Sequence, residues 1–273
     1  MTTITTEHLT ERDDQGFDRV LNIIPSKGTE TDWQFTTALA AGEIARAAAL
    51  PSAHDLREPW WTIGDQEDTG SCVGWATGDG VMRYTLVKAA RIGSNERISP
   101  RFIWMSSKET DEFSSFPGTF IESGGTSLKA AMEVCRKYGV VTEELLPFHI
   151  ATKMYTGDEQ AFWAAAAQRR IRYYNLDKSL DRWKEWLVKT GPILVALQVD
   201  SEWMGATANG GIVDAYRGDP RGGHAVTVVG YRADGRFIVR NSWGTDWGDK
   251  GFAYVSPQYI ADAFFSESYG VQL

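Results

Sequence analysis

The stretch Asn241-Ser-Trp-Gly-Thr-Asp-Trp-Gly-Asp-Lys-Gly-Phe252 decides the interpretation of this sequence, together with the residues that lead into it. Two apolar runs precede it, Ala225-Val-Thr-Val-Val229 and Phe237-Ile-Val239, and the turn-forming pair Asp234-Gly235 stands between them. Apolar runs separated by Asp-Gly predict a β-hairpin. The hairpin brings His224, just before its first strand, near Asn241, just after its second.

Two registers of this hairpin are compatible with the sequence. A strict two-residue turn places Asn241 opposite Val228, about four residues or roughly 13 Å along the strand from His224. Pairing Gly230 with Gly235 instead places His224 opposite Asn241. Because side chains alternate between the two faces of a strand, both registers put the histidine and the asparagine on the same sheet face. The register itself stays open.

A third reactive side chain is Cys72, in the segment Asp65-Gln-Glu-Asp-Thr-Gly-Ser-Cys-Val-Gly-Trp-Ala76. Apolar residues recur at helical spacing from Cys72 to Arg91, and Ser71 stands where an N-cap is expected. The positive end of a helix dipole favours thiolate over thiol, so a cysteine in the first turn is a better nucleophile. A cysteine considered alone is more often a small buried hydrophobic residue, and an isolated histidine or asparagine is more often structural.

Composition limits the possible functions. The chain has 273 residues, 42% of them hydrophobic, which is enough to bury a large core, and its formal net charge is −8. The negative charge argues against a nucleic-acid partner and against an anionic membrane surface. The N-terminus lacks the basic start and apolar run of a secretory signal, and no apolar stretch is long enough to span a bilayer, so we expect a cytoplasmic protein. The sequence does not indicate an oligomeric state.

The sequence contains no pattern typical of a metal-binding or cofactor-binding site. The four histidines are scattered, and neither Cys72 nor Cys135 has a partner at metal-ligand spacing, so we expect no metal site. Phosphate-loop and dinucleotide-binding patterns are absent, and we expect no cofactor. Two cysteines cannot form a disulfide framework, which is typical of a reducing compartment, although one bridge between them stays open.

The chain divides into three stretches. Residues 1–49 form an N-terminal extension, in which alanines between Thr36 and Leu50 predict a helix. Residues 50–165 are mainly helical, and residues 166–273 are mainly β; no flexible linker separates them, so we expect the halves to pack together. The further predicted elements are helices at Ser127–Tyr138 and Asp158–Arg170, a long loop at Ser107–Thr126, and strands at Ile193–Val199 and Phe252–Val255.

Taken together, these segments resemble the papain family of cysteine peptidases from about Leu50 to the C-terminus. Gln66 lies six residues before Cys72, which is the family's spacing for an oxyanion-hole glutamine, and the block that starts at Asn241 is the most specific match. Glu122-Ser-Gly-Gly-Thr-Ser127 is similar to the family's glycine pair beside the substrate. The resemblance implies an α+β fold of two lobes, with a central helix starting at Cys72 in the helical lobe, a β-barrel-like second lobe, and the active site in the cleft between them.

The resemblance also implies a mechanism. Cys72 would be the nucleophile, His224 its acid/base partner, and Asn241 the residue that orients the imidazole, with a thiolate–imidazolium pair between the first two. Gln66 and the backbone N–H of Cys72 would bind the oxyanion. The residues beside the substrate and over the histidine would be Gly124, Gly125 and Trp243.

Three functions remain compatible with this pattern. The first is an endopeptidase or exopeptidase acting on peptides or proteins, the second an acyl transferase or ligase acting on a peptide-like product, and the third a non-catalytic binding protein on the same fold. The family usually has an aromatic residue directly after the nucleophile, whereas here Val73 and Gly74 precede Trp75, which alters the expected cleft wall. We expect the N-terminal extension to be a short propeptide or a packing helix, its Thr36–Ala49 helix lying on the enzyme body or over the cleft.

Overall fold

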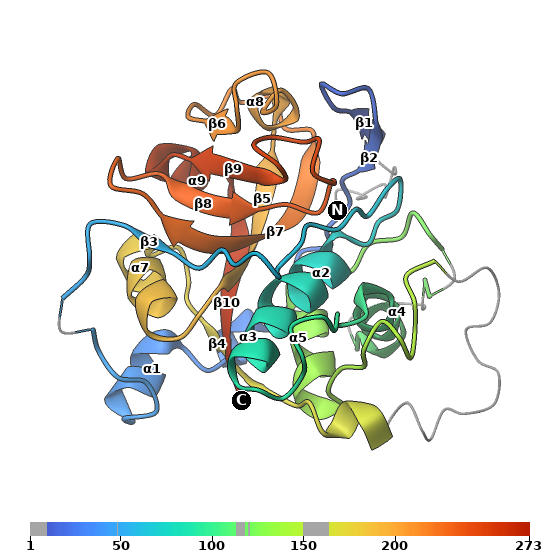
Figure 1. The fold of residues 1–273 in the computed structure, drawn as a ribbon, viewed down its shortest axis with the longest axis vertical. Helices are drawn as coiled ribbons and strands as arrows, with labels where there is room; N and C mark the ends of the chain where they lie inside the picture. The colour runs from blue at the N-terminus through green and yellow to red at the C-terminus, as the bar shows by residue number, and fades with distance from the viewer. Residues whose placement is uncertain (1–9, 48, 113–117, 120, 150–163) are drawn as a thin grey trace.

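A computed structural model of the chain describes residues 10–47, 49–112, 118–119, 121–149 and 164–273 (Figure 1). Its centre is a continuous helical run made of α2 (Cys72–Trp75), a π-helical segment (Ala76–Met82) and α3 (Arg83–Lys88). A methyl group added at Gly74 would come within 2.4 Å of the carbonyl oxygen of Pro100, and one at Gly80 within 2.2 Å of Thr227 Oγ1. These glycines let the run pack closely against a helix on one side and the sheet on the other.

The other helices carry clear start signals. The hydroxyl of Ser99 accepts a hydrogen bond from the backbone N–H of Phe102 at the start of α4, and that of Ser127 accepts from Ala130 at the start of α5. In Figure 1 α2, α3, α4 and α5 gather on one side of the sheet. The remaining bounds are α4 (Pro100–Thr110), α5 (Leu128–Lys137), α1 (Phe35–Ala40), α7 (Leu180–Lys189), α8 (Ser201–Met204) and α9 (Pro257–Ala263), with a 3-10 turn at Thr29–Thr31.

The strands form one sheet of eight and a separate hairpin. The sheet follows the order β4-β10-β5-β7-β8-β9-β6, with β3 pairing β7 off this path. The hairpin consists of β1 and β2 near the N-terminus. The strands are β1 (Thr10–Arg12), β2 (Asp18–Val20), β3 (His54–Asp55), β4 (Arg172–Asn175), β5 (Ile193–Val199), β6 (Ile212–Val213), β7 (Gly222–Tyr231), β8 (Phe237–Arg240), β9 (Phe252–Val255) and β10 (Phe264–Gln272).

The sheet is buried on both faces at its centre. On β5, Val195 and Leu197 belong to one hydrophobic cluster, with Trp183 of α7, whereas Leu194 and Ala196 belong to another cluster that contains Cys72. Alternation with a period of two thus sends successive side chains to opposite sides of the strand. Cys72 approaches β7 on the face of the sheet where α2, α3, α4 and α5 gather.

Several sequence predictions need correction. The helix expected over Thr36–Ala49 ends at Ala40 as α1, and Gly42 follows with a φ of +75°, a left-handed conformation typical of glycine after a helix end. The loop expected over Ser107–Thr126 begins later, because α4 continues to Thr110. The sheet does not close into a barrel among the described strands.

Other predictions match the structure or lie outside it. The strands expected at Ile193–Val199 and Phe252–Val255 are β5 and β9, and the helix expected at Ser127–Tyr138 is α5. Much of the helix predicted at Asp158–Arg170 falls outside the described residues. Cys72 and Cys135 are both free and buried. Every helix in the described part of the chain is too short or too polar to cross a membrane.

Candidate active site

Cys72 lies in the first turn of α2, and its side chain is fully buried. Ser71 stands at the N-cap, as predicted, but makes no capping bond; its hydroxyl instead lies 2.6 Å from Thr69 Oγ1. Backbone N–H groups reach the sulfur, among them that of Ala225, the residue after His224 on β7. Helix and sheet therefore bring the cysteine next to the strand that carries the histidine.

The two residues after Cys72 are explained by packing. Val73 is fully buried, and Gly74 lies so close to α4 that an added methyl group would be 2.8 Å from Cβ of Trp104. Trp75 packs edge-on against Phe148, with ring centroids 5.0 Å apart. The aromatic residue of this segment, Trp75, therefore stands two residues later than the resemblance implies, and Gly74 allows α2 to approach α4 closely.

His224 and Asn241 are in direct contact. His224 Nε2 lies 2.7 Å from Asn241 Oδ1, and both side chains are buried. The backbone N–H of Ser242 also donates to Oδ1, at 2.8 Å, which identifies this atom as the amide oxygen. An amide oxygen only accepts, so Nε2 of the neutral imidazole carries the proton and Nδ1 is the acceptor. Nδ1 has no hydrogen-bond partner among the described residues.

The hairpin adopts neither of the two registers considered from the sequence. Its ladder pairs Thr227 with Arg240, and it shifts between Val228 and Gly230 at a bulge. A bulge adds one residue to one strand and so changes the register along the pair. The prediction that His224 and Asn241 share a face agrees with their contact.

Two tryptophans pack against the histidine, and a third packs against both of them. Trp243 lies 4.8 Å from His224 between ring centroids, tilted by 35°, and Trp203 lies 6.1 Å from the same ring in an edge-on arrangement. Trp247 packs on both indoles, 5.0 Å from Trp203 and 5.5 Å from Trp243. All three are buried. Sequence reasoning identified Trp243 but missed Trp203, which comes from the distant helix α8 and has no motif of its own.

Gln66 is fully buried and held between two segments of the site. Its Nε2 donates to the carbonyl oxygen of Thr69 at 3.0 Å, and its Oε1 accepts from the hydroxyl of Ser242 at 2.8 Å. Its backbone N–H donates to the carbonyl oxygen of Ser242 at 2.8 Å. One of the two amide N–H donors therefore stays available for another acceptor. Ser242, which directly follows Asn241, is a further site residue that sequence reasoning missed.

Burial biases Cys72 and His224 towards their neutral forms. It raises the pKa of Cys72 from 9.0 to about 11, against the opposing effect of nearby backbone N–H groups. It also lowers the pKa of His224 from 6.5 to about 4; the Asn241 hydrogen bond opposes this change, and the charge of Arg19 adds to it. Both shifts favour the neutral thiol and imidazole over the ion pair that the resemblance implies, because burial disfavours the charged form of each group.

A part of the N-terminal extension lies beside the start of β7, where His224 stands. Residues 19–24, called the strap below, pass between the loop that contains Gly125 and the start of β7. The backbone N–H of Ile23 donates to the carbonyl oxygen of Gly223 at 3.3 Å, and that of Ile24 donates to Thr126 at 3.2 Å. The side chain of Ile23 joins the same buried cluster as Cys72.

Close approach to the strap depends on glycines. A methyl group added at Gly125 would lie 2.0 Å from the carbonyl oxygen of Asn22, and one at Gly222 would lie 2.5 Å from that of Leu21. Gly124 faces elsewhere, since its carbonyl oxygen accepts from the indole N–H of Trp104 at 2.8 Å. The backbone-to-backbone contact expected of a peptide at this glycine pair is thus made at Gly125, by the chain's own strap.

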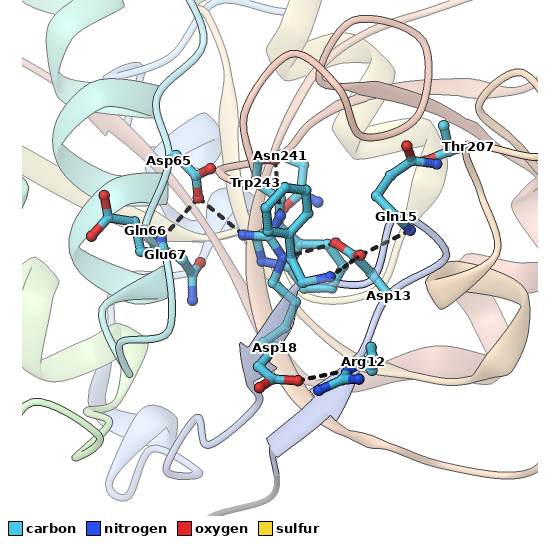
Figure 2. Close-up of polar contacts among 12 residues, drawn as sticks. Arg12, Asp13, Gln15, Asp18, Asp65, Gln66, Glu67, Thr207, Asn241 and Trp243 are labelled. Atoms are coloured by element: carbon cyan, nitrogen blue, oxygen red, sulfur yellow. Dashed lines mark hydrogen bonds and ion pairs between the residues drawn. The ribbon is translucent and has the colours of Figure 1, made fainter.

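Arg19 holds the start of the strap. Its guanidinium donates to Asp13 Oδ2 at 2.9 Å, to Asp65 Oδ1 at 3.0 Å and to the carbonyl oxygen of Trp243 at 3.2 Å, and it lies 5.2 Å from the centre of a Trp243 ring. Only 3% of its side chain is exposed. Figure 2 shows Asp65 on one side of this cluster and Asp13 on the other, with Trp243 between them.

The helix of the extension lies elsewhere. In Figure 1, α1 and the β1–β2 hairpin that leads into the strap are at opposite ends of the molecule. Phe35 of α1 packs edge-on against Trp186 of α7, with ring centroids 6.3 Å apart. The part of the extension near the cysteine is therefore the strap, and the helix packs on the body.

Comparison with known proteins identifies the family. A profile described as "Papain family cysteine protease" matches residues 50–264. The chain is 29% identical over 215 residues to a "Cathepsin L-like proteinase" of Fasciola hepatica, covering 76% of this chain and 61% of that protein. It is 32% identical over 129 residues to "Cathepsin B-like CP2" of Giardia intestinalis, covering 42% of this chain and 41% of the relative. The chain thus spans less than two thirds of the length of these relatives.

A solved structure agrees in fold. Xylellain, a cysteine protease from Xylella fastidiosa, superposes with a TM-score of 0.75 over 99% of both chains at 20% sequence identity. The family profile covers most of the chain, including the segments that carry Cys72, His224 and Asn241. This protein therefore belongs to the papain family of cysteine proteases.

Proposed function

We propose that this chain is a cysteine endopeptidase whose acyl-enzyme forms on Cys72. The observation that carries the proposal is the buried contact between His224 Nε2 and Asn241 Oδ1, which leaves His224 Nδ1 as an acceptor, while the backbone N–H of the next residue, Ala225, reaches the Cys72 sulfur. An oriented imidazole next to a thiol at a helix N-terminus is the arrangement that nucleophilic catalysis requires.

The chemistry follows from these positions. Nδ1 of His224 takes the proton of Cys72, and the thiolate attacks the carbonyl carbon of a peptide bond. The free N–H of the Gln66 amide and the backbone N–H of Cys72 stabilise the oxyanion that forms, at about 3 kcal/mol for each donor. The imidazolium then protonates the leaving amine as the C–N bond breaks, and water, deprotonated by His224, hydrolyses the thioester.

The path of the strap indicates that the site can cleave a substrate polypeptide at an internal peptide bond. The strap runs from Arg19 beside Trp243, past Gly125 and Gly223, to Ile24 beside Thr126, and the polypeptide continues at both ends. A site that accommodates an extended chain passing through it can bind a substrate on both sides of the nucleophile. This supports an endopeptidase rather than an enzyme that requires a free chain end.

The strap also supports a resting state that is closed. Peptide substrates are proposed to lie along Gly124 and Gly125, and the strap takes the space next to Gly125. Because strap and substrate would use the same backbone contacts, only molecules in which the strap has moved aside can act. The appendage proposed to block the cleft is therefore the strap and not α1.

A thiol-directed epoxide tests the proposed nucleophile. We expect it to label the full chain at a single cysteine, to label Cys135→Ala equally, and not to label Cys72→Ala. Because the strap slows access in the full chain, the same comparison is made with Arg19→Ala, in which we expect a larger open fraction. Labelling that persists in Cys72→Ala, or fails in Arg19→Ala, would exclude Cys72 as the reactive residue.

Asn241→Ala should lower kcat by roughly tenfold to a hundredfold with little change in KM. The substitution removes the hydrogen bond that orients His224, a loss of about 1–3 kcal/mol that acts on the chemical step. Peptide hydrolysis at saturating substrate measures it. Asn95→Ala, at an exposed position, serves as the matched amide control. A rise in KM with kcat unchanged would mean that Asn241 only contributes to binding.

Acidification should open the strap. In the closed state the pKa of His224 is about 4, whereas exposure to water returns it towards 6.5, so between these values the open state gains a proton that the closed state lacks. The stability of the closed state is therefore complete above pH 6.5 and falls by about 1.4 kcal/mol per unit down to pH 4, about 3 kcal/mol in all.

Hydrogen exchange measures this opening at the strap itself. The amides of Ile23 and Ile24, corrected for the intrinsic pH dependence of exchange, should lose protection between pH 7 and pH 5. The amide of Leu56, bonded to Val229 at 2.9 Å on β7, provides a control outside the strap. Equal protection of the strap amides at both pH values would contradict the coupling to His224.

A further inference from the structure

The structure assigns a guanidinium-binding subsite to Asp65 and Trp243, which the strap fills with its own Arg19. Peptide substrates are therefore preferred when they carry an arginine that reaches Asp65 and Trp243. The inference rests on the proposed function, since it specifies which peptides the same site accepts. Its basis is that Arg19 contacts both the strap's own hairpin, through Asp13, and the body of the enzyme, through Asp65 and Trp243.

The contacts divide cleanly between these two parts. Asp13, which accepts from Arg19 Nε, precedes β2 and belongs to the hairpin that carries the strap. Asp65, the carbonyl oxygen of Trp243 and the Trp243 ring belong to the enzyme body. When the strap leaves, Asp13 and Arg19 leave with it. A carboxylate, a carbonyl oxygen and an aromatic face then remain, directed at the place where the guanidinium was.

These remaining groups are held in place without Arg19. Asp65 Oδ1 accepts a second hydrogen bond from the backbone N–H of Glu67 at 2.8 Å, and the backbones of Asp65 and Trp243 pair in an isolated β-bridge. The ring of Trp243 is fixed by its packing against Trp203 and Trp247. The subsite is therefore preorganised, and a ligand that replaces Arg19 loses little free energy in shaping it.

The chemistry of the subsite selects arginine. A guanidinium can donate to a carboxylate and to a carbonyl oxygen while its flat face lies on an indole, as Arg19 does here. The ammonium of lysine lacks the planar fork, and a neutral side chain leaves Asp65 without a counter-charge. The side chain of Asp65 is 43% exposed even with Arg19 bound, so it is accessible to a peptide from outside. A net charge of −8 also attracts cationic peptides at low ionic strength.

The subsite lies next to the catalytic groups. Asp65 directly precedes Gln66, and the ring of Trp243 lies 4.8 Å from that of His224. A substrate arginine seated there would fall a few residues from the bond that is cut, as Arg19 falls three residues before Asn22, whose carbonyl meets Gly125. Arginine at one defined position, rather than basic charge in general, is the expected determinant.

A binding measurement tests the subsite without requiring turnover. The protein is the full chain with Cys72→Ala and Arg19→Ala, and the probes are a peptide with the sequence of residues 17–24 and the same peptide with citrulline, the neutral isostere, in place of arginine. We expect the arginine peptide to bind about tenfold more tightly, as for a charge-assisted hydrogen bond. Adding Asp65→Asn should abolish the difference, whereas Glu67→Gln, which removes an equal charge two residues away, should preserve it. Equal affinity of the two peptides would overturn the inference.

A hydrolysis measurement extends the test to substrates. Peptides in which a single arginine or citrulline is moved along the sequence are given to Arg19→Ala and to Arg19→Ala with Asp65→Asn. One position should show an arginine-to-citrulline ratio of about ten in kcat/KM, and Asp65→Asn should bring it near one. Cleavage of all peptides with ratios near one would reject the subsite but not the protease. Absence of cleavage with the binding difference intact would reject the proposed function but not the subsite.

Discussion

Cys72→Ala is expected to lower kcat/KM for peptide hydrolysis by about ten-thousand-fold or more. Loss of the nucleophile in a catalytic unit of this kind removes the covalent pathway altogether and leaves only the contribution of binding and of the oxyanion donors. The fold should be retained, because alanine is smaller than the buried cysteine and Cys72 makes no disulfide. The measurement is hydrolysis of a fluorogenic peptide, with circular dichroism to confirm folding.

Cys135→Ala is the matched control for this experiment. Cys135 is equally buried, on α5, in the same hydrophobic cluster as Cys72, but the backbone N–H of Ala225 on β7 reaches the sulfur of Cys72 and not that of Cys135. Its replacement should leave kcat/KM within about twofold while lowering stability slightly, as expected for a small core cavity. If both alanine variants lost activity equally, the effect would reflect the shared core and not catalysis.

Arg19→Ala is expected to raise kcat/KM of the full chain by about a hundredfold. Removing one partner of a buried ion pair costs about 3–5 kcal/mol, and the part of this loss that comes from Asp65 and Trp243 falls only on the closed state, because the contact with Asp13 stays within the hairpin when the strap opens. A change of 2.8 kcal/mol increases the open fraction about a hundredfold while the closed state dominates. The same substitution removes a positive charge that lowers the pKa of His224.

The same hairpin offers a control for this effect. Arg12 pairs with Asp18 at 3.0 Å, but both side chains are largely exposed, 69% and 50%. Exposed ion pairs contribute little to stability because water screens them, so Arg12→Ala should change kcat/KM by no more than about fivefold. Activation by both substitutions to the same degree would mean that any charge change on the hairpin opens the strap. Unchanged activity in Arg19→Ala would show that the strap does not limit access.

The pairing of His224 with Asn241 could be expected from the sequence because period-two alternation constrains which residues share a face. The register could not, because the bulge between Val228 and Gly230 adds a residue without a distinctive sequence signal. Gln66 and Cys72 could be proposed as site residues from the sequence, because their separation of six residues matches the spacing of the papain family. Ser242 and Trp203 were not, since their contacts with Gln66 and His224 come from tertiary packing.

The strap shows a second limit of sequence reasoning. Alanines between Thr36 and Leu50 favour a helix, and α1 does form, but it ends before Gly42 and packs against α7. The segment that reaches the cysteine instead has a short mixed sequence around Asn22 with no periodicity. Its position depends on the glycines at 125 and 222 and on the buried Arg19, which lie far apart in the sequence. Local pattern cannot report contacts of this kind.

Capture of the acyl-enzyme tests the central claim most directly. Arg19→Ala is mixed with a slowly hydrolysed peptide ester, quenched in acid, digested and analysed by mass spectrometry. The account predicts an acyl group on the peptide that contains Cys72, its disappearance on further incubation with water, and its absence from Cys72→Ala. An acyl group on another residue, or hydrolysis with no acyl group on Cys72, would contradict it.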